Sequence, residues 1–194
     1  MRHANTLLAL ALAATTAATT AAAAPATYAI DPAHTFPSFE ADHMGISVWR
    51  GKMNKSSGKV VYDKASGAGT VEITTELASI DFGQDALNGW ARGKDFFDVK
   101  RNPRAVYKGR FDAPVNGVPT QLVGELTLHG VTRPLTLKIH LLKCIPHPML
   151  KRDYCGADAS GRFNRDDFGL GAGKDWGFKM DVDLRIQAEA IAEK

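Results

Sequence analysis

The chain has 194 residues, 44% of them hydrophobic and 23% charged, and a formal net charge of +3. Residues 1–23 contain one Arg and no acidic residue, so the remainder has 23 basic and 21 acidic residues and a charge of +2. This near-neutral balance gives no indication of nucleic-acid binding or of attraction to an anionic surface. About 170 residues suffice for one domain with a sizeable core.

The first 24 residues have the composition of a secretory signal peptide. Arg2 precedes an apolar run over residues 7–14, and small residues follow as far as Ala24. The apolar run is too short for a stable transmembrane anchor, and the segment has no Cys to lipidate. We expect cleavage after Ala23, because a cut after Ala24 would leave Pro25 immediately past it. The alternative is a disordered tail rich in Ala and Thr. A signal peptide over residues 1–23 predicts export to the periplasm and a mature domain over residues 24–194.

The rest of the chain is dominated by runs in which apolar and polar side chains alternate, the pattern of half-buried strands. These runs occupy residues 27–30, 39–43, 59–62, 71–77, 105–111, 122–129, 135–141 and 178–188. The one helical candidate covers residues 84–94, where Gly89 and Gly93 weaken the helix propensity. Many short strands separated by turn residues predict an all-β, antiparallel sandwich or barrel with one short helical segment.

The hairpin at residues 124–141 has a clear alternation in both arms. We expect its inward rows to be Leu126 and Leu128 in the first arm, and Leu135, Leu137, Ile139 and Leu141 in the second. Two arms cannot bury these faces alone, so other strands must complete the sheet. The last run contributes a further inward row, which we expect to be Phe178, Met180, Val182 and Leu184.

Several short motifs, taken in order, resemble the YceI-like family. They are I-D-P-A-H-T at residues 30–35 with Phe39 and H-M-G at 43–45, S-I-D at 79–81, K-D-F-F-D at 94–98 with Pro103, G-E-L-T-L-H-G-V-T-R-P-L-T-L at 124–137, and N-R-D-D-F-G-L at 164–170. Together they span most of residues 27–188. Two positions depart from the family pattern. Pro37 stands where an apolar strand residue is usual, and it removes a donor from the strand ladder. Ala91 stands where Leu is common before the D-F-F motif.

This resemblance implies a periplasmic protein with a lipocalin-like antiparallel β-barrel of about eight strands. The family's interior holds a polyisoprenoid or similar lipid, so the chain is expected to be a non-catalytic carrier or storage protein for a quinone or polyprenyl compound. No cofactor is expected besides that lipid. Some members are dimers, so the resemblance allows a homodimer, and it allows a membrane-associated donor or acceptor of the lipid.

Periodicity reports burial and not emptiness, so by pattern alone a filled core is favoured over an open tunnel. An eight-stranded barrel can take either form, and only the resemblance favours the tunnel. The residues expected to line it are Phe39, Phe111, Leu126, Leu128, Leu135, Leu137, Ile139, Phe168, Phe178, Met180, Val182 and Leu184.

A second group of residues is expected at the tunnel mouth or against a lipid head group: His34, His43, Trp90, Phe96, Phe97 and Arg165. The two histidines are nine residues apart, and a purely structural role competes with ligand binding for both. The aromatic group either closes one end of the barrel or belongs to its core. Arg165 is expected to pair with an acid such as Asp98 while Phe168 caps the cavity; the alternative is a surface salt bridge of little energetic value.

The two cysteines, Cys144 and Cys155, are predicted to form a disulfide, because an even count in an exported chain favours one. The alternative is a soft metal site made by both thiolates and His147, although no fourth ligand is evident. The chain contains no G-x-S-x-G, H-E-x-x-H or C-x-x-C-H motif, so neither a nucleophile elbow, a zinc protease site nor covalent haem is indicated. We therefore predict no metal site. A redox or metal protein using Cys144, His147 and Cys155, and an envelope interaction module with a filled core, remain the alternative functions.

Overall fold

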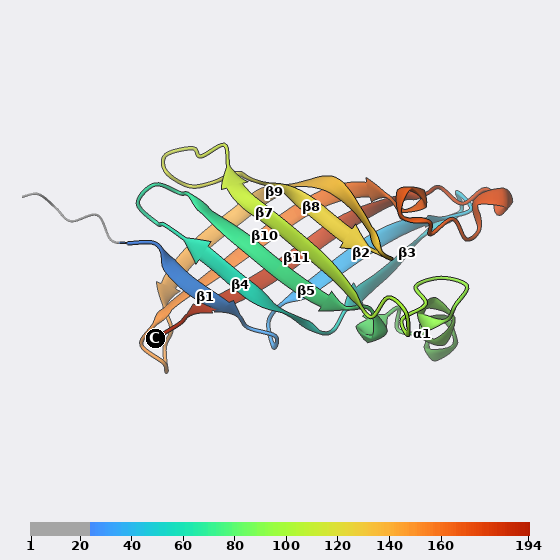
Figure 1. The fold of residues 1–194 in the computed structure, drawn as a ribbon, viewed down its shortest axis with the longest axis horizontal. Helices are drawn as coiled ribbons and strands as arrows, with labels where there is room; N and C mark the ends of the chain where they lie inside the picture. The colour runs from blue at the N-terminus through green and yellow to red at the C-terminus, as the bar shows by residue number, and fades with distance from the viewer. Residues whose placement is uncertain (1–23) are drawn as a thin grey trace, which may run out of the picture.

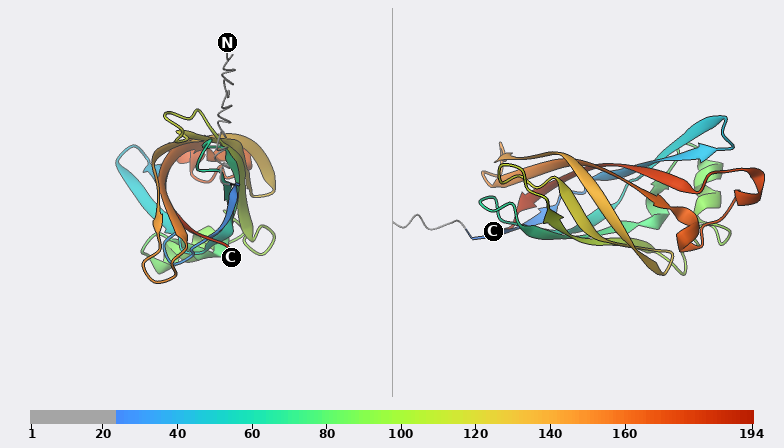
Figure 2. Two further views of the ribbon diagram at one scale, coloured as in Figure 1. Left: turned by 90° about the vertical axis from the view of Figure 1, so that its left-hand side faces the viewer. Right: turned by 90° about the horizontal axis from the view of Figure 1, so that it is seen from above.

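The computed structural model describes residues 24–194, so the predicted signal peptide lies outside the described residues. The chain forms one antiparallel sheet of eleven strands in the order β1-β4-β5-β7-β8-β9-β10-β11-β2-β3-β6, with an additional pairing between β1 and β11. That pairing closes an eight-stranded barrel, seen end-on in Figure 2, while β2, β3 and β6 extend its wall (Figure 1). The predicted fold class is confirmed.

The strands are β1 (Ala26–Ile30), β2 (Phe36–His43), β3 (Ser47–Met53), β4 (Ser56–Tyr62), β5 (Gly69–Glu76), β6 (Ile80–Asp81), β7 (Arg104–Asp112), β8 (Gln121–Leu128), β9 (Val131–Pro146), β10 (Asp153–Asn164) and β11 (Asp181–Ala192). The helical elements are α1 (Asp85–Arg92) and three 3₁₀ turns, η1 (Leu77–Ser79), η2 (Arg165–Phe168) and η3 (Lys174–Trp176). Within residues 24–194, none of the helices has the length and apolar character needed to cross a membrane.

The predicted helix is confirmed as α1, which lies at one end of the barrel (Figure 1). The side chain of Gln84 caps it by accepting a hydrogen bond from the backbone N–H of Leu87. Its apolar face packs on the barrel end, where Ala91 is completely buried in a cluster with Leu77 and Ile80. The small side chain at position 91 therefore lets the helix approach the sheet closely.

β1 and β2 pair with different parts of the same strand, β11. The ladder along β11 is interrupted between them, at residues 31–35. Thr35, which is 1% exposed, fills the break because its hydroxyl donates to the carbonyl of Glu189 (3.2 Å) and accepts from its N–H (3.1 Å). Pro37 lies at the start of β2, one residue before β3 begins to pair with this strand. The missing N–H is tolerated there because the ladder with β3 has not yet begun.

Three strands were not predicted from the sequence: β3, the two-residue β6, and β10. The pattern of β3 was present, since Trp49, Gly51 and Met53 alternate with Arg50 and Lys52. The strand predicted at residues 178–188 begins later, at Asp181, and runs on to Ala192.

The prediction that Leu141 shares the inward face of β9 is wrong. A β-bulge shifts the register between β9 and β10, because Ile139 pairs with Ala159 whereas Leu141 pairs with Asp158. The extra residue, His140, reverses the alternation beyond it. Leu141 is therefore 52% exposed on the outside, and Leu142 faces inward instead.

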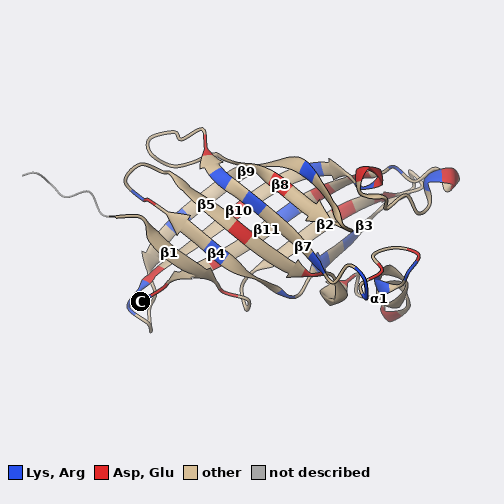
Figure 3. Cartoon of the chain, in the orientation of Figure 1, with Lys and Arg blue, Asp and Glu red and all other residues tan. Residues whose placement is uncertain are grey.

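The outer faces of the strands are charged. Figure 3 shows Lys and Arg interspersed with Asp and Glu along the barrel wall. Several of these charges pair across neighbouring strands, such as Lys108 with Glu72 at 3.0 Å and Arg162 with Asp183 at 2.7 Å. The apolar rows consequently face the interior.

Candidate functional site

The barrel encloses an apolar cavity of about 870 Å³. Its lining extends along β11 from Val182 to Ala190, eight steps of about 3.3 Å, or roughly 26 Å of strand. With the 35–45° tilt of barrel strands this corresponds to about 20 Å along the axis. The volume lies within the range of small-molecule sites, and the shape suits a long ligand. The interior is therefore open, although periodicity alone favoured a filled core.

Most of the predicted wall residues lie on this cavity. They are Phe39, Phe111, Leu126, Leu128, Leu135, Leu137, Ile139, Phe178, Val182 and Leu184. Two are buried elsewhere. Phe168 is 1% exposed and packs edge-on against Phe163 (5.4 Å between ring centroids) in the cluster beneath α1, so it does not cap the cavity. Met180 precedes the first residue of β11, and it is buried without contributing to the cavity wall.

The wall contains further residues that the sequence analysis did not single out, including Tyr28, Trp49, Tyr62, Phe82, Tyr107, Leu122 and Leu142. Tyr28 and Tyr62 belong to strands that were predicted only as short runs, and Trp49 belongs to β3, which was not predicted. Phe82 lies in the segment before α1. The signal available was the same alternation over shorter distances. Leu142 carried no such signal, since its direction depends on the bulge.

Small side chains on β10 and β11 help to keep the cavity open. Ala157 pairs with Ala188, and Ala159 pairs with Ile186, and all four residues line the cavity. Each Ala leaves space that a Leu or Phe would fill. Because its inward residues are small, β10 lacks the alternation of large apolar and polar side chains by which a strand is recognised in sequence. The same small residues leave space in the interior.

The polar groups of the interior are already hydrogen-bonded. The Tyr107 ring covers Gly109, and its hydroxyl lies 3.1 Å from the carbonyls of both Leu122 and Leu135, to which it donates. Burial raises the pKa of Tyr107 to about 12, so the phenol is neutral at physiological pH. Among residues 24–194, no buried side-chain N or O atom lacks a hydrogen-bond partner. The cavity thus offers an apolar surface with no unsatisfied group to select a polar ligand.

One end of the cavity is closed by side chains. Tyr28 and Tyr62 line it there and are 1% and 7% exposed. The Tyr28 hydroxyl donates to Asp153 (3.3 Å), which also pairs with Lys64 across the end of the barrel. Burial and then the charge of Asp153 raise the pKa of Tyr28. This end provides no exposed lining residue.

The other end, next to α1, contains the mouth. The four exposed residues of the lining are Met44, Trp90, Asp95 and Trp176. Met44 follows β2, Trp90 and Asp95 lie on and after α1, and Trp176 belongs to η3. All three elements lie at the same end of the barrel in both views (Figures 1 and 2). Access to the cavity is therefore from this end.

The residues predicted at the mouth are brought together there, with one exception. His43 stacks on Trp49 (4.1 Å between centroids) and meets Phe178 edge-on (4.9 Å). On the α1 side, Phe96 stacks on Trp90 (4.9 Å). The remaining aromatic, Phe97, both lines the cavity and belongs to the buried cluster beneath α1, so the two roles considered for this group coexist. The mouth is consequently walled by aromatic rings.

Arg165 also lines the cavity near the mouth, but it does not pair with Asp98 as predicted. Its guanidinium donates to the carbonyls of Leu170 and Ala172, the latter at 2.7 Å, and lies 5.8 Å from the Phe96 ring centroid. Burial lowers the pKa of Arg165, which is 7% exposed. Its hydrogen bonds hold the loop that leads to η3. Arg165 therefore has a structural role in shaping the mouth.

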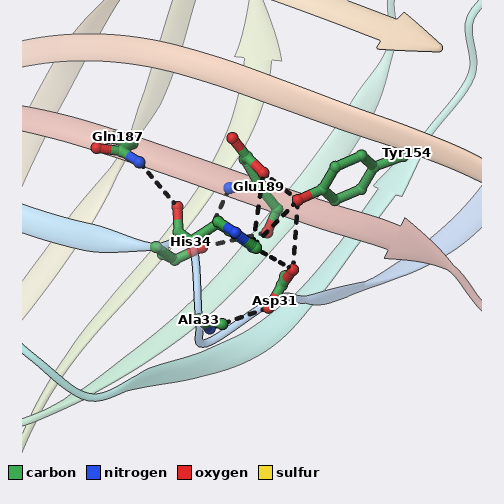
Figure 4. A network of polar contacts seen from close by, with 7 residues as sticks. Asp31, Ala33, His34, Tyr154, Gln187 and Glu189 are labelled. Carbon is green, nitrogen blue, oxygen red and sulfur yellow. Dashed lines mark hydrogen bonds and ion pairs between the residues drawn. The ribbon is translucent and has the colours of Figure 1, made fainter. Parts of the chain in front are cut away.

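His34 is the exception, because it lies on the outer surface of the barrel and not in the cavity lining. Figure 4 shows it in a network with Asp31, Tyr154 and Glu189, in which His34 Nδ1 is 2.8 Å from Asp31 and 3.9 Å from Glu189. The Tyr154 hydroxyl donates to Glu189, and burial followed by this bond raises the pKa of Tyr154.

The acid and the imidazole of this network stabilise each other's charged forms. Hydrogen bonding and charge from Asp31 raise the pKa of His34. Desolvation acts to raise the pKa of Asp31, but hydrogen bonds from His34 and the Ala33 N–H outweigh it and lower the pKa. Asp31, His34 and Glu189 present ligand atoms within 4.8 Å of one another, a grouping able to hold a cation. Through these contacts and the Tyr154 hydroxyl, the segment between β1 and β2 is held against β10 and β11.

The predicted disulfide between Cys144 and Cys155 is confirmed. The two residues are directly paired across β9 and β10, with 4.0 Å between their Cα atoms. Because both sulfurs are bonded to each other, neither is a free thiolate. His147 instead accepts hydrogen bonds through Nδ1 from the backbone N–H groups of Met149 and Leu150, both at 3.2 Å, within the β9–β10 turn.

The sequence and the fold are similar to those of several known proteins. The family profile described as YceI-like domain matches residues 28–190. A UPF0312 protein of Pseudomonas paraeruginosa is 32% identical, over 97% of this chain and 98% of that protein. The crystal structure of Burkholderia cenocepacia BcnA is similar, with a TM-score of 0.67, 24% identity, and coverage of 82% of this chain and 98% of that one. A polyisoprenoid binding domain from Saccharophagus degradans, implicated in plant cell wall breakdown, has a TM-score of 0.62, 18% identity, and coverage of 86% and 98%.

Proposed function

The chain belongs to the YceI-like family, and on this premise we propose that it binds one long-chain lipid inside the barrel. The lipid class we favour is a polyisoprenoid, such as a quinone or polyprenyl compound, bound without a covalent link. The protein is then a carrier or store of that lipid and not an enzyme.

The observation that supports this proposal most strongly is the cavity. It is long, lined by apolar side chains, and free of unsatisfied buried polar atoms within residues 24–194. A long hydrocarbon gains about 25 cal/mol for each Å² of apolar surface that leaves water, and it requires few hydrogen bonds. A polar metabolite would lose its hydration here without replacement partners.

Two further observations agree with the proposal. One structural neighbour is described as a polyisoprenoid binding domain, and although its 18% identity carries only the fold, the fold provides the cavity. The disulfide and the N-terminal segment together favour the periplasm, since disulfides persist in oxidising compartments. The alternative of a thiolate metal site finds no support, because its two cysteines are joined to each other.

Native mass spectrometry of protein purified from its own cell envelope tests the function. We expect a folded species whose mass exceeds that of the polypeptide by one long-chain lipid, which organic extraction then releases for identification. A folded, disulfide-bonded protein that consistently carries no lipid would contradict the carrier function. Two reactive thiols with stoichiometric zinc would instead favour the metal-site alternative.

A further inference from the structure

Large apolar side chains are exposed around the mouth of the cavity. They are Met44, 48% exposed, Ile46, 79%, Trp90, 43%, and Trp176, 75%. Met44 and Ile46 lie in the turn between β2 and β3, whereas the tryptophans lie on α1 and η3. We call these four residues the apolar rim. Three of them also line the cavity, so the exposed apolar surface is continuous with the interior.

The position of the rim is fixed by the structure beneath it. Arg165 holds the carbonyls of Leu170 and Ala172 in the loop before η3. η3 itself lies between Gly173 and Gly177, whose φ angles of +81° and +83° are readily adopted by glycine. The Trp176 ring is therefore presented to solvent by a defined turn. Together with the other exposed apolar side chains of the rim it forms an apolar patch, and such patches mark interaction sites.

Several charges near the rim are paired within the protein. Lys174 contacts Asp166, Lys179 lies 3.9 Å from Asp42, and Arg50 lies 2.9 Å from Glu40. Figure 3 accordingly shows both signs of charge at this end of the barrel. An interaction made by the rim should depend on apolar contact and not on attraction to anionic groups.

We propose that the apolar rim inserts into the interfacial layer of a lipid bilayer, so that the mouth of the cavity opens directly onto the membrane. The proposal rests on the lipid-binding function proposed above. A lipid that left the cavity through water would expose its whole apolar chain, whereas contact between the rim and a bilayer gives a continuous apolar path. Tryptophan suits this location because its amphipathic ring is favoured at membrane interfaces.

The opposite end of the barrel supplies a matched control. Met149, in the turn after β9, is 82% exposed, close to the 79% of Ile46, and like Ile46 it does not line the cavity, but it lies away from the mouth. If exposed apolar area alone caused membrane binding, Met149 would contribute as much as Ile46. If the mouth is the docking surface, only the rim matters.

The test is flotation of the purified protein with vesicles of phosphatidylcholine alone and of phosphatidylcholine with phosphatidylglycerol, at low and high salt. We expect the wild type to bind both, with little effect of salt. The double variant Ile46→Ser/Trp176→Ser should lose at least about tenfold in vesicle partitioning, because two large apolar groups no longer enter the interface. Met149→Ser should bind like the wild type. Circular dichroism should be unchanged in both variants, since the substituted side chains are exposed. Bound-lipid content should be unchanged in Met149→Ser and in the single variant Ile46→Ser, because neither residue lines the cavity.

Several results would overturn the proposal. They are a wild type that carries lipid but does not bind phosphatidylcholine vesicles, binding that requires phosphatidylglycerol and vanishes at high salt, and equal losses in the rim and control variants. Failure of the underlying function is distinguishable, because it appears as absence of lipid from the wild-type protein whatever the vesicle result. If Ile46→Ser/Trp176→Ser fails to fold, Ile46→Ser alone provides the same comparison at an exposed rim position outside the cavity lining.

Discussion

Substitution of Leu184 by Asp tests the inward assignment of β11 most directly. Leu184 lines the cavity, pairs with Gly161 on β10 and with Phe39 on β2, and packs against the cluster that contains Leu135 and Leu137. An aspartate here would place a carboxyl group against an apolar wall. Its neighbours Gly161, Phe39, Leu135 and Leu137 provide no cation to balance its charge.

The cost follows from two terms. Loss of the partly buried Leu side chain costs up to about 2 kcal/mol. Keeping an Asp of ordinary pKa 3.9 protonated at pH 7 costs about 4 kcal/mol, since each unit of pKa shift corresponds to about 1.4 kcal/mol. The sum, up to about 6 kcal/mol, is comparable with the whole stability of many domains. We therefore expect Leu184→Asp either to remain unfolded at pH 7 or to unfold at much lower denaturant concentration and to carry no lipid.

The expected pH dependence separates the charge from the lost packing. In the folded variant the pKa of the new carboxyl is raised above its unfolded value, so the folded state binds a proton that the unfolded state lacks. Its stability deficit relative to the wild type should consequently shrink as the pH falls from 7 toward 4, leaving up to about 2 kcal/mol for packing. Urea denaturation at several pH values, followed by circular dichroism, measures this deficit.

Two controls define the refuting result. Leu184→Asn removes the same packing without adding a charge, so its deficit should not depend on pH. Arg185→Asp changes the neighbouring residue on the outer face, where the Arg is 3.7 Å from Glu40 and its side chain is 61% exposed, and should cost less than about 1 kcal/mol. Equal stability of Leu184→Asp and Arg185→Asp, or a deficit in Leu184→Asp that ignores pH, would refute the inward assignment.

Three other perturbations have expected outcomes. Val182→Trp should reduce the lipid that copurifies while the barrel stays folded, because the indole occupies cavity space. Undiminished lipid would mean that Val182 does not line the part of the cavity that holds the lipid chain. Replacing both Cys144 and Cys155 by Ala should lower the free energy of unfolding by about 3 kcal/mol, from the loop-closure entropy of their eleven-residue separation, as measured by chemical denaturation. Asp31→Asn should lower the pKa of His34 in an NMR titration toward that of a free imidazole, because Asp31 stabilises the protonated ring; an unchanged titration would contradict the contact.

The first two of these perturbations have controls within the same protein. Val61, 38% exposed on the outer face of β4, is the control for the cavity, since Val61→Trp should leave lipid content unchanged. Reduction of the wild-type disulfide should reproduce the loss seen in the double Ala variant. For the histidine, the protonated ring is favoured in the folded state, so this contribution to stability is present at low pH and decreases as the pH rises through the folded pKa.

Much of the fold is readable from the sequence because alternation is a local property. A strand with one buried face must place apolar residues at every second position, so the pattern alone predicts that Leu135, Leu137 and Ile139 face inward, whatever their partners are. The helix and the disulfide are also predicted from the sequence, the disulfide because the chain has only two cysteines. The ordered motifs supplied the family resemblance, and with it the closed barrel.

Other features depend on the folded path of the backbone and not on the alternation of side chains. Leu141 continues the alternation of β9 but points outward, because a bulge shifts the register of β9 against β10 between Asp158 and Ala159. Arg165 has acids nearby in sequence, yet its hydrogen bonds go to carbonyls that the turn before η3 brings to it. Neither outcome is encoded in the spacing of the residues concerned.

The cavity itself was decided only by the tertiary structure. Alternation identifies residues that leave water, but the same inward rows can fill a core or surround a space. Which one results depends on the summed volume of side chains that face one another across the barrel, including the small residues Ala157, Ala159 and Ala188 on strands β10 and β11. That sum requires the strand order, the register and the closure by β1 and β11 to be known, because it is a property of opposing walls and not of any single strand.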